Sequence, residues 1–454
     1  MTAAETLGEF VAGLRWDALE PKLQEKVRAH VLDTLGVMCA GVGTAEAASA
    51  QAAVRRWGGA EEATVVGRDW RVPAPQAAFL NAFHARLHTF DDTYEAGPLH
   101  PGSAIVSAAL AAAESCGASG AEFLTAVLAG YETATRMSAA LGPTHYGSGF
   151  HNTGTCNAFG ACAAAARIYA LDAGAIAEAL GLAGEAAAGL RQYQEDGSMV
   201  DSSLNGARAA QTGVASVELR NAGLRGPRGI FDGRWGVCSV MSADPHLERL
   251  TEGLGATFVF SETALKPYPS CRFTHGPIHA LLALQKRYGF EAGDVAEIEI
   301  STFLESMNVS DKPDIATRFD AVLSHQYNAA LALMDGRITL QSFDEARRTD
   351  PALRALSARV RVVHEPELEA RYPAAWPHNV AVTLRDQRRF EAVSDRPPGG
   401  CDSPLAWEDV AEKFMQLAAP ELGRTPAERV VGMIGRLHQG RDIGQLSQAL
   451  RSST

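Results

Sequence analysis

Three clusters of polar side chains interrupt otherwise apolar sequence, and their residue types can do chemistry. The first, HTFDDTYEAGPLHPG at 88–102, combines carboxylates and hydroxyls with His100. An imidazole exchanges protons near neutral pH, and neighbouring carboxylates can orient it or bind a ligand. The same side chains also cap helices, because Asp92 or Thr93 would accept hydrogen bonds from amides at a helix start. On the residues alone, both interpretations stay open.

The second cluster is HYGSGFHNTGTCNAFG at 145–160. His151 and Asn152 fall at a predicted helix start, where unpaired amide groups can hold an anion. A lone histidine is more often structural than functional, so His151 gains weight only beside the other clusters.

The third cluster, LKPYPSCRFTH at 265–275, contains Lys266, Cys271, Arg272 and His275. The chain carries a formal charge of −12, so an anionic substrate would need a local cationic patch of this kind. An arginine can hold a carboxylate through two parallel hydrogen bonds. The alternative is a solvated linker, and Cys271 is better explained as a pocket wall than as a nucleophile.

Periodic apolar residues predict the helices that must position these clusters. Spacings of three and four residues predict a helix over 22–41, and Ser119 with Glu122 forms a capping-box pattern at the start of another. The remaining helices of the first part are predicted at 75–90, 102–116, 119–141, 153–170, 173–190 and 206–223.

From about residue 264 the pattern changes. Segments 295–302, 356–365 and 378–386 alternate apolar and polar residues, as half-buried antiparallel strands do, and helices are predicted at 274–288 and 322–334. After a loop at 396–404 the helical pattern returns. The predicted fold is mainly α, with a large all-helical domain (1–263 and 404–454) and a smaller α+β domain (264–403) inserted before the C-terminal helices.

Composition narrows the classes of function. Seven scattered cysteines without a CxxC pair indicate free thiols in a reducing compartment, so we expect a cytoplasmic protein. No signal-peptide pattern or membrane-length apolar run occurs, and the absence of a basic run argues against nucleic acid as partner. The nucleotide motifs GxGxxG and GK[ST] are missing, as is HExxH, so side chains alone are expected to perform any chemistry.

The three clusters, in this order and spacing, resemble the MmgE/PrpD family, whose members include 2-methylcitrate dehydratase, cis-aconitate decarboxylase and iminodisuccinate epimerase. The segments VLDTLGVMCAG, GFHNTGT, LNGARAAQTGVAS and SHQYNAALAL carry the resemblance along nearly the whole chain. It implies a helical domain completed by the C-terminus, an α+β lid, a homodimer, a small carboxylic acid as substrate, and no metal or organic cofactor.

The resemblance also implies site residues. The catalytic positions it suggests are His100, His151, Lys266 and Tyr327. The substrate-binding positions are Thr89, Asp92, Thr93, Asp201, Cys271, Arg272 and His275. Decarboxylase-like members carry an aspartate at the position of Thr89 and a lysine at that of Asp201. These departures predict a substrate other than cis-aconitate or 2-methylcitrate.

The predicted activity is that of a cofactor-independent lyase or isomerase. A dehydratase, decarboxylase or epimerase of this kind moves a proton, or loses CO2, next to a carboxylate. The alternatives are a catalytically inactive relative that binds a small metabolite, and a metal hydrolase using the pairs His84/His88 and His275/His279. No metal site is expected, because histidine pairs at this spacing are common by chance.

Overall fold

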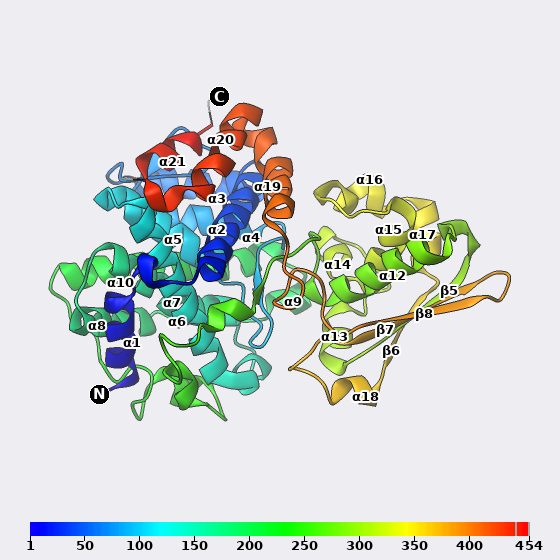
Figure 1. Ribbon diagram of the computed structural model, residues 1–454, viewed down its shortest axis with the longest axis horizontal. Coiled ribbons are helices and arrows are strands. Elements are labelled where there is room, and N and C mark those ends of the chain that lie inside the picture. The colour runs from blue at the N-terminus through cyan, green and yellow to red at the C-terminus, as the bar shows by residue number, and fades with distance from the viewer. Residues whose placement is uncertain (441–442, 453–454) are drawn as a thin grey trace.

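The computed structural model describes residues 1–440 and 443–452, apart from the side chains of Met199 and Asp201. Most of the chain is helical, and a small mixed sheet lies near the C-terminus, so the predicted fold class is confirmed (Figure 1). We call α1 to α11 with α19 to α21 the helical unit, and α12 to β8 the sheet unit.

The helical unit begins at the N-terminus and is completed by the last helices of the chain. In Figure 1, α19 and α20 lie beside α2, and the contacts between these helices confirm this packing. Its helices are α1 Ala3–Gly13, α2 Pro21–Gly41, α3 Ala45–Trp57, α4 Ala74–Arg86, α5 Gly102–Cys116, α6 Gly120–Gly147, α7 Asn152–Ile168, α8 Ala173–Gly184, α9 Tyr193–Asp196, α10 Met199–Asn221, α11 Val237–Met241, α19 Trp407–Leu422, α20 Arg424–Gly435 and α21 Gly444–Ala449.

The sheet unit packs helices against a mixed sheet of order β6-β5-β7-β8. Its strands are β5 Val295–Thr302, β6 Val360–His364, β7 His378–Leu384 and β8 Arg389–Ser394. Its helices are α12 His275–Tyr288, α13 Leu304–Ser310, α14 Arg318–Leu323, α15 His325–Asp335, α16 Glu345–Arg348, α17 Pro351–Ser357 and α18 Pro366–Glu369.

Each unit has its own hydrophobic core. One core draws on buried residues between 4 and 265 and between 410 and 450, and the other on residues between 278 and 384. Two connecting segments, about 265–274 and 395–406, join the units. The domain limits predicted at 263/264 and 403/404 fall near these segments and stay a prediction.

The sheet differs from the predicted antiparallel arrangement at one strand. β6 pairs parallel to β5, whereas β7 pairs antiparallel to both β5 and β8. The helices α13 to α17 lie between β5 and β6 in the chain. A connection of this length can carry the chain back to the other end of the sheet, so that β6 runs in the same direction as β5. Strand β8, which was not predicted, follows β7 through a tight turn at Gln387, whose φ is 72°.

The predicted all-helical domain also contains two short strand pairs. β1 Ala63–Thr64 pairs with β2 Arg71–Val72, and β3 Thr93–Tyr94 pairs with β4 Thr263–Ala264. The helix predicted at 173–190 ends early, at Gly184. Beyond that point the chain pairs with the loop before α7 instead, since Gly189 accepts from the His151 amide and Arg191 donates to Gly149.

One further property concerns membranes. Within the described residues, no single helix has the length and apolarity needed to cross a bilayer. Only α2 and α3 taken together pass that test, and they are bent by 91° at the break between them.

Candidate active site

The loop between α4 and α5 is anchored by Asp92. This buried carboxylate accepts a hydrogen bond from the Gly102 amide at the start of α5 (2.9 Å) and another from the Tyr131 hydroxyl (2.6 Å). Burial raises the pKa of Asp92 to about 7. One oxygen therefore fixes the start of α5 and the other binds a side chain of α6, so the capping interpretation describes Asp92.

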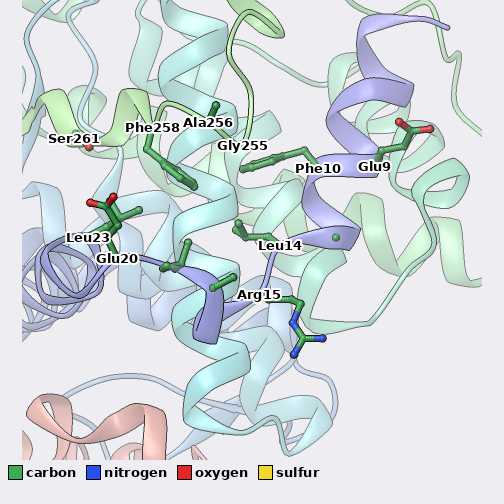
Figure 2. A pocket seen from close by; sticks show the side chains of 13 residues that line it. Glu9, Phe10, Leu14, Arg15, Glu20, Leu23, Gly255, Ala256, Phe258 and Ser261 are labelled. Carbon is green, nitrogen blue, oxygen red and sulfur yellow. The ribbon is translucent and has the colours of Figure 1, made fainter.

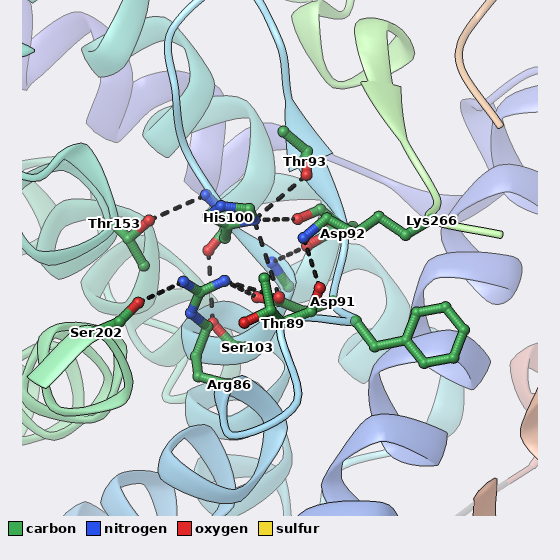
Figure 3. A network of polar contacts seen from close by, with 12 residues as sticks. Arg86, Thr89, Asp91, Asp92, Thr93, His100, Ser103, Thr153, Ser202 and Lys266 are labelled. Atoms are coloured by element: carbon green, nitrogen blue, oxygen red, sulfur yellow. Dashed lines mark hydrogen bonds and ion pairs between the residues drawn. The ribbon is translucent and has the colours of Figure 1, made fainter. Parts of the chain in front are cut away.

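Lys266 reaches the same loop from the other end of the sequence. Pairing of Thr93 with Ala264 brings β4 alongside β3, and the Lys266 Nζ donates to the Thr89 carbonyl at 2.7 Å (Figure 3). The side chain is fully buried, and burial lowers the pKa of Lys266 to about 8. In the described part of the chain no carboxylate lies within 4.0 Å of Nζ, so the ammonium keeps N–H groups for a ligand.

A cavity of about 90 Å³ lies between the two units at this point. It brings together seven of the residues predicted from the sequence, which are Thr89, Thr93, His100, His151, Lys266, Cys271 and Arg272. Its wall also contains residues that the sequence did not single out, among them Arg86, Tyr146, Tyr193, Gln194, Ser202, Phe319 and Trp376. The three polar clusters thus converge, although they are far apart in the sequence.

His100 is held as a neutral base. Its Nδ1 lies 2.7 Å from the Asp92 carbonyl oxygen, which can only accept, so Nδ1 carries the proton and Nε2 keeps its lone pair. Burial lowers the pKa of His100 well below its usual range, and the charges of Arg86 and Lys266 lower it further. The ring is 18% exposed, and the Asp91 carboxylate lies 3.9 Å from Nδ1.

His151 has the opposite proton arrangement. The Asn205 side-chain amide donates to Nδ1 at 3.0 Å, so the neutral ring carries its proton on Nε2. That nitrogen donates to the Tyr193 hydroxyl oxygen at 3.2 Å, which leaves the phenolic proton of Tyr193 for another acceptor. Burial lowers the pKa of His151 well below its usual range, with Arg86 adding to the effect.

Arg86 was missed from the sequence and is central to the site. Its Nη1 donates to both oxygens of Asp91 (2.7 and 2.8 Å), and its Nη2 donates to the Ser202 hydroxyl at 2.7 Å (Figure 3). Its Nε is buried without a hydrogen-bond partner among the described residues, as is the Nε1 of Trp376. The i, i+5 spacing of Arg86 and Asp91 is not a recognised motif, and Ser202 comes from a distant helix.

Arg272 and its neighbours join the connecting segments. Its guanidinium donates to Glu95 (2.7 Å) and to the carbonyls of Pro397 (3.0 Å) and Pro398 (2.6 Å), so few donors remain for a substrate. His275 lies behind it, 3.3 Å from Nη1, and is not on the cavity wall. Burial raises the pKa of the Cys271 thiol, which fits a wall residue rather than a nucleophile.

Tyr327, like Asp92 and His275, was predicted for the site and does not line this cavity. Tyr327 lies on α15, fully buried in the core of the sheet unit, and its hydroxyl donates to the Ser342 carbonyl at 2.7 Å. The side chain of Asp201 lies outside the described residues. The structure therefore offers Tyr193 in place of Tyr327 as the tyrosine beside the histidines.

Lys413 does not line the cavity, but it binds backbone groups of the segments that carry the site residues. Its buried Nζ pairs with Asp33 at 2.7 Å and donates to the carbonyls of Phe90 and Lys266.

Replacing Lys413 with methionine should destabilise the fold by about 3–5 kcal/mol, because Asp33 would keep an unpaired buried charge. Thermal unfolding measures the loss, and exposed Lys286→Met is the control expected to unfold like wild type. An unchanged unfolding temperature for Lys413→Met would contradict this role.

Comparison with known proteins shows the family to which this chain belongs. The MmgE/PrpD N-terminal domain matches residues 5–250, and the MmgE/PrpD C-terminal domain matches residues 268–439. The chain belongs to the MmgE/PrpD family, as its sequence motifs indicate.

Several curated relatives are similar over nearly all of their length. Cis-aconitate decarboxylase of Mus musculus is 25% identical over 472 residues, covering 99% of this chain and 93% of the relative. The enzyme of the same name from Homo sapiens is 25% identical over 457 residues, covering 98% and 94%. That from Aspergillus terreus is 24% identical over 471 residues, covering 97% and 94%.

Proposed function

We propose that this protein is a lyase or isomerase that moves a proton at the carbon next to a carboxylate of a small carboxylic acid, using side chains alone. The observation that carries the proposal is the pair of neutral histidines with opposite proton arrangements beside one buried ammonium. His100 has a free lone pair, whereas His151 supports a hydroxyl donor. A ring nitrogen with a free lone pair can accept a proton, and a hydroxyl with a free proton can return one.

In this proposal His100 Nε2 removes the proton and the Lys266 ammonium stabilises the negative charge that develops on the carboxylate. The buried N–H groups of Arg86 and Trp376 supply further donors, since buried donors without a protein partner call for a ligand. Tyr193 then returns a proton, and His151 stabilises the tyrosinate. Return of the proton to the opposite face gives an epimer. In a dehydration Tyr193 instead protonates the leaving hydroxide, which departs as water and leaves an alkene. In a decarboxylation the loss of CO2 takes the place of proton removal, and Tyr193 protonates the carbanion that remains.

The substrate we propose carries fewer carboxylates than the three of cis-aconitate. Thr89 and Asp201 stand where decarboxylase-like members carry an aspartate and a lysine, so one cation is lost. The Arg272 donors are already bound to Glu95 and to backbone carbonyls. Phe319 and Trp376 add apolar wall, which disfavours further charged groups.

A screen of small hydroxy, unsaturated, amino and imino carboxylic acids tests the proposal. Products are detected by liquid chromatography and mass spectrometry, and binding by thermal shift. Conversion of at least one acid is the expected result. Stabilisation by one or more of these acids, with conversion of none of them, would contradict the proposal and favour a relative that only binds its metabolite.

The pH dependence of kcat/KM follows from the free protein's groups. His100 acts as base when neutral, and its lowered pKa keeps it neutral well below pH 6.5. Lys266 acts as a cation and loses its proton as pH rises through about 8. We therefore expect a plateau that includes pH 6 to 7.5 and a fall above about 8, near tenfold per pH unit.

Lys266→Arg is the matched variant for this profile. An arginine stays charged throughout the range, so any activity it retains should lose the alkaline fall. An acidic fall centred at or above pH 6.5 would contradict the lowered pKa of His100 on which the mechanism depends.

A further inference from the structure

A second cavity, of about 570 Å³, lies beside the connecting segments. One wall is the first half of α2, including Leu23 and Lys26. The opposite wall comes from both connecting segments, with Leu265 from the first and Pro404 and Leu405 from the second. A ligand here would touch both segments that join the helical unit to the sheet unit.

We call this second cavity the hinge cavity; it and the candidate active site are lined by neighbouring residues of the first connecting segment. Leu265 lines the hinge cavity, while the next residue, Lys266, lines the active-site cavity. The two connecting segments are also bound to each other, since the Leu265 amide donates to the Gly399 carbonyl at 3.0 Å. Gly399 has a φ of 91°, and a Cβ there would meet the Leu265 carbonyl oxygen. The segments therefore have little freedom to shift separately.

Lys26 gives the cavity a charge. Its half-buried Nζ donates to the carbonyls of Ser261 (2.8 Å) and Thr263 (2.7 Å), which leaves one N–H group. No carboxylate lies within 4.0 Å of it in the described part of the chain, and burial lowers the pKa of Lys26 to about 8. An ammonium in partly dry surroundings gains by pairing with an anion.

The other walls restrict which anion fits. Leu23, Leu405 and Trp407 provide an apolar surface, which favours a ligand with a hydrocarbon body. The exposed rim carries Glu20, Lys22 and Glu25, whose net charge is negative and disfavours a second carboxylate. The cavity thus selects a single anionic group attached to an apolar chain.

A neighbouring cavity of about 630 Å³ lacks such a charge. It shares Glu20, Leu23 and Ser261 with the hinge cavity, and its apolar side chains Phe10 and Phe258 face each other in Figure 2. The Arg15 on its wall is largely exposed and paired with Asp17 at 2.8 Å. It offers no buried cation to an anionic ligand.

We propose that the hinge cavity is a second ligand site, which binds a small amphipathic monocarboxylate with its carboxylate on Lys26 and its chain against the apolar wall. The ligand holds the two connecting segments in one arrangement, next to Lys266. The site is separate from the active-site cavity, so the proposal stands whether or not the proposed activity is correct.

Protection of a thiol tests this site directly. Cys401 is exposed and lines the hinge cavity, whereas Cys116 is exposed at the end of α5, away from it. Iodoacetamide labelling of both thiols is followed by peptide mass spectrometry with sodium octanoate as the probe ligand. At ten times its dissociation constant, octanoate should slow labelling of Cys401 about tenfold and leave Cys116 unchanged. Uncharged 1-octanol should protect much less.

Two variants make the test decisive. Lys26→Met keeps the packing but removes the charge, and Leu405→Trp fills the cavity; each should remove the protection by octanoate. Thermal unfolding identifies which variants remain folded, and either folded variant suffices. Absence of protection in the wild type at millimolar octanoate would overturn the proposal. Equal protection in the wild type and in a folded variant would also overturn it.

Discussion

Lys266→Met is expected to lower kcat/KM by about a hundredfold to a thousandfold while the protein remains folded. The ammonium is the cation on the cavity wall that has no carboxylate partner among the described residues, so it stabilises the charge of the transition state. Loss of one such donor from a closed site costs about 3–4 kcal/mol of transition-state stabilisation. Steady-state kinetics with the converted acid measures the effect.

The unfolding temperature separates this role from a structural one. Methionine fills similar space, and the fold loses one hydrogen bond, to the Thr89 carbonyl, worth about 1 kcal/mol. Lys413→Met, from the neighbouring buried lysine, should show the reverse pattern of lower stability and active folded protein. A Lys266→Met variant with full turnover would contradict the assigned role, whatever its stability.

The second large effect is expected from variants that separate the role of His100 from that of His151 and Tyr193. His100→Gln should slow removal of the substrate proton by about a hundredfold to ten-thousandfold, since general bases contribute rate factors of this size. Tyr193→Phe should leave proton removal largely intact and slow the return of the proton. The reason is that His100 presents a lone pair, whereas Tyr193 presents a proton supported by His151.

Exchange with D2O distinguishes these steps. For Tyr193→Phe, deuterium should enter recovered substrate faster than product forms, whereas His100→Gln should lose exchange and product formation together. His151→Gln is the matched variant and should behave like Tyr193→Phe. If His151→Gln lost exchange and His100→Gln kept it, the acid and base roles would have to be reversed.

Local sequence signals predicted the helices well. The bounds of α5 at Gly102 and Cys116 match the prediction, because Gly117 follows with a φ of 65° and ends the helix. The capping box of Ser119 and Glu122 is present at the start of α6, and that helix runs on past a kink at Gly142. Such features depend on neighbours within one turn.

The pairing of strands that are far apart in the sequence could not be predicted from local signals. The β3–β4 pair is only two residues long on each strand, yet it carries Lys266 to Thr89. The parallel pairing of β6 depends on the route of the chain through several helices, which periodicity does not reveal.

The same limit explains which site residues were missed or misplaced. Arg86 ends a helix as an ordinary basic residue would, and its function depends on Asp91 and the distant Ser202. Tyr327 matches a family segment, but the face of α15 that carries it packs into the core of the sheet unit. A tyrosine near the histidines comes instead from the short helix α9.

Proton NMR in D2O tests the central claim most directly, with the wild-type protein and each acid that the screen finds converted. The account predicts that the carbon next to the carboxylate loses its hydrogen or gains a deuterium from the solvent, and that His100→Gln abolishes the loss of hydrogen. Conversion of the acid with no hydrogen lost and no deuterium gained at that carbon would contradict proton transfer as the chemistry of this site.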